Sequence, residues 1–422
     1  ACCHAVSQSE VLMKVYSCPA CGGAMEWDGA SGGLKCRNCG TALSVREAAP
    51  AGYHRYQALP SFMSLQPYQC LPVRCPVCGA ETKTDGRTVS LICPYCGAGL
   101  VLDGKQLAFA RPDGTARLMI PGDRVRLLIK EWCGRHPFAP DLTSKHLEVK
   151  FISPQYIPFW VFSARVTAKY TGRGGRNMTV TEKNARGIAV TRTAVDWHPI
   201  SGTASADLEG FCVPADQDIA GDYASFLWRS TPADAFSAWQ SEYFAGSFSF
   251  LPTVPVNEAE AMAHERMVPE IKRRTVAELS RSCSHIDFRE FSVSYSGRGW
   301  RLVQIPAYFV ICRYHGGIYV DAVNGVTGEI FGTYPISLRK VTIFYATAAA
   351  VLIPGYLFFD YGSCGMRGCL TDSGSIFADA LIALCVATGA YALISIALRL
   401  RILGKDDLRS SPWLREIADR TR

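Results

Sequence analysis

The clearest alternation of apolar and polar residues lies between positions 160 and 170. Because successive side chains of a strand point to opposite faces, this alternation predicts a strand with one buried face. The glycine-rich stretch 172–176 predicts a turn, and 188–197 and 203–213 predict further strands of an antiparallel meander. The residues expected on the buried face of the first strand are Trp160, Phe162, Ala164, Val166, Ala168 and Tyr170.

Three segments are expected to be helical: 123–134 and 231–243 from apolar residues at helical spacing, and 257–280 from a loose capping-box pattern of Asn257 and Glu260. Each opens on a residue typical of a helix start, and Pro269 inside the third predicts a kink. A second β section follows, in which the dipeptide Asn324-Gly325 predicts a hairpin turn. We therefore expect a multidomain α+β protein, whose domain over residues 105–338 is a β-rich antiparallel meander with inserted helices.

Two long apolar stretches come after this domain. Val341–Phe359 has no charged residue, and Ile376–Leu398 has only Asp379. With a rise of about 1.5 Å per residue, each helix would span the roughly 30 Å hydrocarbon core of a bilayer. We expect a two-helix transmembrane hairpin over 339–400 with a tail over 401–422. A buried helical hairpin is the alternative.

The flanking charges predict how this hairpin is oriented. Basic residues flank its outer ends, at 339–340 and 399–409, whereas the loop 360–375 carries one cation. The positive-inside rule then places both chain termini in the cytoplasm. Cys364 and Cys369 would lie on the outer loop, either as a small disulfide or as free thiols.

The length, the net charge and the first residues of the chain say less about fold and function. The 422 residues allow two to four domains, and the net charge of +7 is modest for that length. Residues 1–12 lack the basic and apolar regions of a signal peptide, and we expect the segment before Met13 to be an over-extended start or a non-native remnant.

Four Cys-x-x-Cys-Gly knuckles occur in the first quarter of the chain, as two copies of one module. In each copy, 14 residues separate the two knuckles. Two thiolates two residues apart reach one side of a tetrahedral ion, and a second pair completes it. The glycine suits a turn that needs positive φ. We expect zinc ribbons over 13–47 and 73–104, a linker over 48–72, and two structural Zn²⁺ ions bound by Cys18, Cys21, Cys36, Cys39, Cys75, Cys78, Cys93 and Cys96.

Sites of four thiolates are closed and leave no position for water or substrate, so zinc is expected to be structural. The sequence has no nucleotide-binding, metalloprotease or serine-hydrolase motif. Its eight histidines are scattered, and no spacing supports a Cys–His nucleophile pair, although such a pair stays open. We expect no catalytic and no cofactor-binding residues, and hence a protein that is not an enzyme. Four single cysteines on apolar stretches are expected to pack as small hydrophobic residues: Cys133, Cys212, Cys283 and Cys312.

The order of these features resembles a family of bacterial membrane proteins labelled as TFIIB-type zinc-ribbon or primosomal-protein-N′-like. The likeness spans roughly residues 13–400, although the chain lacks the Walker A lysine of a helicase motor. Besides the doubled ribbons, it is carried by Arg111-Pro112-Asp113, Trp132 with Phe138-Ala139-Pro140, Tyr156-Ile157-Pro158-Phe159-Trp160, Tyr243-Phe244-Ala245-Gly246 and Val323-Asn324-Gly325 with Thr327-Gly328.

This resemblance implies partners at the bacterial inner membrane: phage-shock protein A-like or SPFH-like proteins, or a second membrane subunit. Together with the architecture, it predicts a non-enzymatic, membrane-anchored zinc-ribbon adaptor that recruits or scaffolds proteins at the cytoplasmic face. The alternative is a membrane-tethered nucleic-acid-binding protein. In each ribbon, however, two cations are balanced by two acids, which is a poor match to a phosphate backbone.

Overall fold

The structure is a computed structural model in which part of the chain can be described. The described residues are 13–46, 52, 54–55, 71–84, 87–102, 111–136, 138–139, 147–151, 154–183, 189–219, 221–314, 317–333, 336–337, 339–344, 346–347 and 350.

The chain divides into two compact units, and each combines segments that are distant in sequence. Unit 1 comprises Ala1–Leu118, Gln155–Gln217 and Thr231–Pro306, and unit 2 comprises Met119–Pro154, Asp218–Ser230 and Ala307–Arg422. The strands are β1 (Met13–Lys14), β2 (Met25–Asp28), β3 (Gly33–Cys36), β4 (Ala42–Ser44), β5 (His54–Arg55), β6 (Leu71–Arg74), β7 (Glu81–Thr84), β8 (Thr88–Ile92), β9 (Gly99–Leu102), β10 (Gly114–Ala116), β11 (Leu147–Phe151), β12 (Gln155–Lys183), β13 (Ala189–Pro214), β14 (Phe236–Ser237), β15 (Phe248–Phe250), β16 (His285–Tyr314), β17 (Gly317–Asn324) and β18 (Ile330–Gly332). The helices are α1 (Gly122–Gly134), α2 (Gly221–Ser230) and α3 (Val256–Leu279), with 3₁₀ turns η2 (Ala233–Ala235) and η3 (Ser241–Phe244).

Most strands belong to one large mixed sheet, in which 13 strands are hydrogen-bonded in the described part of the chain. Its pairs are mostly antiparallel, but β12 runs parallel to β15 and β10 runs parallel to β16. The prediction of a β-rich domain with inserted helices is confirmed in its coarse form, as a large mixed sheet with few helices. The simple antiparallel meander is wrong, because short strands from distant segments pair beside the long ones and two of these pairs are parallel.

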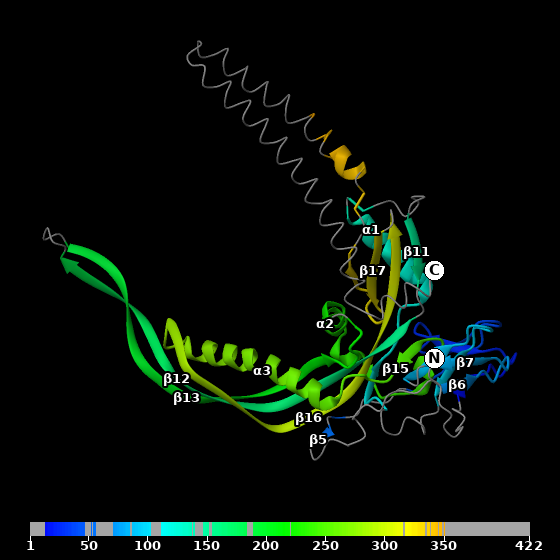
Figure 1. Ribbon diagram of the computed structural model, residues 1–422, viewed down its shortest axis with the longest axis horizontal. Helices are drawn as coiled ribbons and strands as arrows, with labels where there is room; N and C mark the ends of the chain where they lie inside the picture. The colour runs from blue at the N-terminus through cyan, green and yellow to red at the C-terminus, as the bar shows by residue number, and fades with distance from the viewer. Residues whose placement is uncertain are drawn as a thin grey trace, which may run out of the picture. The chain divides into compact units, whose positions relative to one another are not determined.

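A long hairpin of β12 and β13 dominates unit 1 (Figure 1). Its strands pair from Phe159 and Pro214 at one end to Lys183 and Ala189 at the other. Helix α3 packs on one face of the hairpin and buries the predicted period-two stripe from Trp160 to Ala168, with Met267 in the same core, whereas Tyr170 is only half-buried. This confirms the alternation between positions 160 and 168, and Pro269 lies inside α3 without ending it.

The predicted turn at 172–176 is wrong, because these residues continue β12. A Cβ atom at Gly172 would lie 2.2 Å from the carbonyl oxygen of Asp287 on β16. A Cβ atom at Gly174 would lie 2.4 Å from the sulfur of Cys283. The glycines therefore allow close approach of a neighbouring segment and do not mark a reversal of the chain.

The predicted helix over 231–243 is also wrong. This segment forms η2, β14 and η3, and β14 pairs with β10 through Ala116 and Phe236. Phe236 and Tyr243 are nevertheless buried, so the sequence pattern does identify the apolar positions. Tertiary pairing with β10 overrides the helical spacing here.

Unit 2 contains the last part of β16 with β11, β17 and β18, and helices α1 and α2. The Asn324-Gly325 turn is confirmed, because the side-chain oxygen of Asn324 accepts a 2.8 Å hydrogen bond from the backbone of Val326.

Residues 339–344 are helical. Among the described residues, no helix is long and apolar enough to cross a membrane. Most of the predicted hairpin, with Cys364 and Cys369, lies outside the described residues.

Candidate metal centres

The four knuckles share one backbone geometry. In each, the glycine N–H donates to the carbonyl of the first cysteine, at 2.8–3.0 Å. The N–H of that cysteine donates in turn to the carbonyl of the residue after the glycine, which is Gly23, Thr41, Ala80 or Ala98. The glycines Gly22, Gly40, Gly79 and Gly97 have φ between 72° and 75°. The positive φ expected from the sequence is therefore confirmed, and these turns bring the two sulfurs of each knuckle together.

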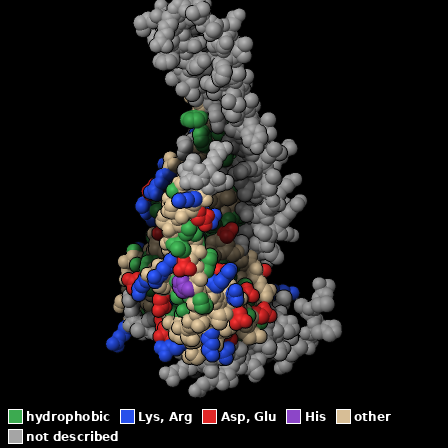
Figure 2. Space-filling model, turned by 90° about the vertical axis from the view of Figure 1, so that its left-hand side faces the viewer, with side chains coloured by type: hydrophobic (Ala, Val, Ile, Leu, Met, Phe, Trp, Pro, Cys, Tyr) green, Lys and Arg blue, Asp and Glu red, His purple; other side chains and the backbone are tan. Residues whose placement is uncertain are grey.

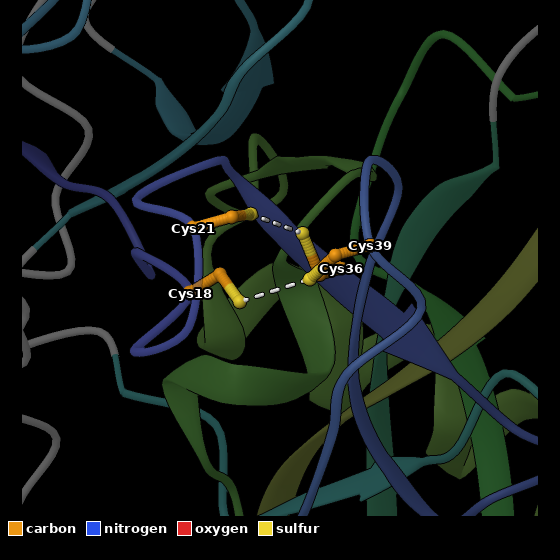
Figure 3. A group of neighbouring side chains, drawn as sticks. All are labelled: Cys18, Cys21, Cys36 and Cys39. Atoms are coloured by element: carbon orange, nitrogen blue, oxygen red, sulfur yellow. Dashed lines mark hydrogen bonds between the residues drawn. The ribbon is translucent and has the colours of Figure 1, made fainter.

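The eight predicted ligands form two separate groups of four. Within each group, all the Sγ atoms lie within 4.8 Å of one another. In the first group, the Cys18–Cys39 and Cys21–Cys36 sulfurs are each 3.5 Å apart (Figure 3). In the second, Cys75–Cys96 and Cys78–Cys93 are 3.7 and 3.8 Å apart. Zn–S bonds of about 2.3 Å in a tetrahedron place sulfurs about 3.8 Å apart, so both groups fit a zinc ion.

Each centre has a buried side and an exposed side. The first cysteine of every knuckle is buried and the second is exposed. At the exposed side of the first centre, the Thr41 hydroxyl lies 3.1 Å from the sulfur of Cys39. This hydrogen bond, with one from the Thr41 backbone, lowers the pKa of the Cys39 thiol to about 6. Both effects favour the thiolate form that a metal needs.

The first ribbon is attached to the rest of unit 1 through Trp27 on β2. Its backbone N–H donates to the carbonyl of Ala245 at 2.9 Å, and its indole Nε1 donates to the carbonyl of Leu118 at 2.8 Å. The ring also meets Tyr243 edge to face at 4.7 Å. Trp27 is 8% exposed, so these contacts are protected from water and fix the ribbon in place.

An ion pair lies at the junction between the two ribbons. The guanidinium of Arg37, in the second knuckle of the first ribbon, binds the carboxylate of Glu26 and also approaches Gly97 of the second ribbon. Burial raises the pKa of Glu26, while Arg37 opposes that shift. A Cβ atom at Gly246 would lie 2.9 Å from this carboxylate. Close packing thus joins the two ribbons to the segment after η3.

The second half of the second ribbon is part of the large sheet, whereas its first half, β6 and β7, forms a separate two-stranded sheet. Its strands β8 and β9 pair with each other, β9 pairs with β1, and β8 pairs with β15. Behind the metal group lies a small apolar core that includes Val73, Leu91 and Leu100, with Met13 from β1. The two halves of this ribbon therefore share one metal site on one side and one apolar core on the other.

The outer surfaces of the two ribbons differ in chemistry. In the second ribbon the variable knuckle positions carry Val77 and Tyr95, which are 54% and 71% exposed. In the first ribbon the equivalent positions carry Ala20 and Asn38. Only the second ribbon thus presents large apolar side chains at both of its knuckle tips.

One pair that the sequence could not reveal lies beside the hairpin. The sulfur of Cys283 is 3.6 Å from Nε2 of His198, although the two are 85 residues apart. Cys283 is only 3% exposed and packs beneath Gly174, so the thiol is closed to a substrate. Cys212 and Cys312 are buried as expected, and burial raises the pKa of each thiol. Cys133 is half-buried.

Comparison with protein-family models, with curated proteins and with solved structures finds no match to this chain. The resemblance to the bacterial zinc-ribbon membrane family therefore stays a prediction. The two four-cysteine groups, consistent with zinc ribbons, rest on their own geometry.

Proposed function

We propose that this protein is a non-enzymatic adaptor that binds a protein partner through the knuckle tips of its second ribbon. We further propose that the apolar stretches within 339–400 anchor it in the bacterial inner membrane, with the ribbons on the cytoplasmic side. In this account zinc holds the docking surface in shape and takes no part in a reaction, because four thiolates fill its coordination sphere.

The observation that carries the proposal is the exposure of Val77 and Tyr95 beside the second metal group. Pro76 and Pro94 precede them and are also exposed, so Cys78 and Cys96 each follow two exposed apolar residues. Aromatic residues on a rigid support are typical centres of protein interfaces, since little conformational entropy is lost when they are covered. The pairing of β8 and β9 within the large sheet provides that support.

The alternative, nucleic-acid binding, has one feature in its favour, because an exposed Tyr95 could stack on a base. The charges count against it. Arg37 is engaged by Glu26, and the guanidinium of Arg87 lies 3.9 Å from the carboxylate of Asp216. Among the described residues between the first and last cysteine of each ribbon, the other cations are Lys35 and Lys83, both exposed. Two lysines are too few to neutralise a phosphate backbone.

The proposal is tested by isolating the tagged full chain from its native membranes in mild detergent and identifying bound proteins by mass spectrometry. Three forms are compared: wild type, the double variant Val77→Ser/Tyr95→Ala, and the matched first-ribbon variant Ala20→Ser/Asn38→Ala. A fourth form, Cys75→Ser/Cys78→Ser, removes the second metal group itself.

We expect defined partners with the wild type and the first-ribbon variant, and their loss with the other two forms. The variant Val77→Ser/Tyr95→Ala, here the knuckle-tip variant, should still contain two zinc ions per chain. Its loss of partners therefore cannot be ascribed to unfolding. Partners that remain bound to the knuckle-tip variant would contradict docking at this surface. Nucleic acid bound in a salt-dependent manner would support the alternative instead.

A further inference from the structure

In the described part of the chain, the outer edge of β13 is open along the distal half of the hairpin. Among the described strands, β13 pairs only with β12, whereas β12 is flanked by β13 on one side and β16 on the other. Strand β16 begins at His285, and the backbone N–H of Ser284 donates to the carbonyl of Gly175 at 2.7 Å. Beyond that point β12 and β13 continue as a two-stranded ribbon (Figure 1). Such a ribbon is marginally stable alone, and its edge is a template for a further strand.

The direction of the backbone groups on this edge follows from the same hydrogen bond. The carbonyl of Gly175 points toward β16, so Gly175 and its partner Trp197 form a non-hydrogen-bonded pair of the β12–β13 ladder. The N–H and C=O of Trp197 therefore point outward, as do those of the other odd-numbered residues of this segment. Pro199 agrees with this assignment to odd-numbered residues, because a proline is tolerated in a ladder where its nitrogen faces away from the partner strand.

The free segment is described from Ala189, the first residue of β13, to Pro199, which has no N–H to donate. The residue midway between these limits is Ala194. If a second copy of the segment paired antiparallel about a two-fold axis at Ala194, Thr193 would face Val195 of the second copy in a hydrogen-bonded pair. The outward-pointing backbone groups would then be used, except the carbonyl of Ala189, which would face Pro199 and its missing N–H.

Charge complementarity supports the same register. In that pairing Arg192 lies opposite Asp196 of the second copy, on the same face of the sheet, and each contact occurs twice. A shift of the axis to residue 192 or 196 would place two arginines or two aspartates opposite each other. Within one chain Arg192 already binds Glu182 diagonally across the ladder at 2.9 Å, and Arg176 pairs across from Asp196, so Arg192 and Asp196 would each lie between two opposite charges. Figure 2 shows the face of the molecule that carries this end of the hairpin, where basic and acidic side chains are interspersed.

We propose that the distal hairpin is a self-association surface, through which two copies of this chain pair along residues 189–199 of β13 about a two-fold axis at Ala194. A closed, isologous contact of this kind is the commonest form of homodimer. It would cover the open edge in the described structure and join two adaptors into one unit with two second ribbons.

The experiment uses two differently tagged copies of the full chain, co-expressed and isolated from membranes in mild detergent. The variants are Arg192→Glu and Asp196→Arg. In homotypic pairs, each variant places like charges opposite each other at both contacts, and we expect about a tenfold fall in the co-purified fraction relative to wild type. When one copy carries Arg192→Glu and the other carries Asp196→Arg, one contact joins the two native residues and the other joins the two substituted ones. Opposite charges then meet at both contacts, and co-purification should return.

Cross-linking provides a second readout. In a non-hydrogen-bonded antiparallel pair the Cα atoms are about 4.5 Å apart, a spacing that a disulfide accepts. Ala194→Cys should therefore yield a disulfide-linked dimer under mild oxidation, and the matched variant Thr193→Cys should not. Two zinc ions per chain in every variant would show that the ribbons are intact. Wild-type copies that do not co-purify, single variants that pair as well as wild type, or a mixed pair that fails to recover would each overturn the proposal.

Discussion

The indole nitrogen of Trp27 and the backbone carbonyl of Leu118 lie 2.8 Å apart, although 91 residues separate them in the chain. This buried hydrogen bond attaches the first ribbon to the body of unit 1. The ribbons are therefore not independent modules on a flexible tether. One is fixed by Trp27, and the other has two of its strands, β8 and β9, in the large sheet.

Replacing Trp27 by phenylalanine should loosen the first ribbon without removing any zinc ligand. The carbonyl of Leu118 would lose its donor in a buried place, at a cost of about 1–3 kcal/mol. We expect a lower urea midpoint and faster release of one zinc ion, measured with a colorimetric chelator. Trp197→Phe, at a site that is 43% exposed, is the control and should change neither quantity by much. Equal effects of both variants would show that the hydrogen bond is not what fixes the ribbon.

Gly79→Ala tests the geometry of the knuckles. Gly79 has φ of 73°, and a Cβ atom added there would meet no other atom within 4 Å, so the only obstacle is the backbone conformation. An alanine there should cost about 1–2 kcal/mol and weaken zinc binding at the second ribbon accordingly. Gly122→Ala, at the start of α1, also meets no neighbouring atom and has no positive φ, so it should be neutral. Chelator competition measures both, and unchanged zinc affinity in Gly79→Ala would contradict the turn.

Removal of zinc should affect the two cores of unit 1 differently. The core behind the second metal group contains Val73 and Leu100, whereas the core beneath α3 contains Trp160 and Met267 and no zinc ligand. After treatment with a strong chelator we expect fast hydrogen exchange in β8 and β9 and continued protection in β12 and α3, measured by mass spectrometry. A uniform loss of protection would mean that the long hairpin also depends on zinc.

Asp321 on β17 should make unit 2 less stable as the pH rises. Its carboxyl is 1% exposed, and burial raises its pKa to about 8. The native state holds this proton up to that pH, while the unfolded chain releases it near the ordinary value of 3.8. Unfolding therefore releases a proton between these limits, and the free energy of unfolding falls as pH rises, by about 1.4 kcal/mol per unit.

The prediction is checked with Asp321→Asn in urea titrations between pH 6 and 8, a range that limits proton competition for the zinc thiolates. The variant should lose less stability than wild type over this range. Asp207→Asn is the control, because Arg165 lowers the pKa of Asp207, which is then ionised in both states throughout. Parallel pH profiles of wild type and Asp321→Asn would show that Asp321 is ionised in the folded protein.

The metal centres could be predicted from the sequence because their information is local. The spacing of Cys18 and Cys21 determines the knuckle, and the glycine that follows determines its turn. The period-two stripe from Trp160 to Ala168 is likewise sufficient to predict a half-buried strand. In both cases the residues that decide the structure lie within a few positions of one another.

The wrong predictions involve partners that are distant in sequence. The glycine-rich pattern places Gly172 in a turn, but its small size accommodates the backbone at Asp287. Phe236 fits a helical stripe, but it pairs with Ala116 in a sheet. The contact between Cys283 and His198 and the attachment of Trp27 also depend on the assembled fold, and no local pattern in the sequence indicates either one.

The most direct test of the adaptor account is photocross-linking in living cells at two equivalent knuckle positions. A photoreactive amino acid replaces Tyr95 in the second ribbon or Asn38 in the first, and adducts are identified by mass spectrometry. The account predicts defined protein adducts at position 95 that are absent at position 38. Identical adducts at both positions, or none at position 95 in a protein that retains two zinc ions, would contradict it.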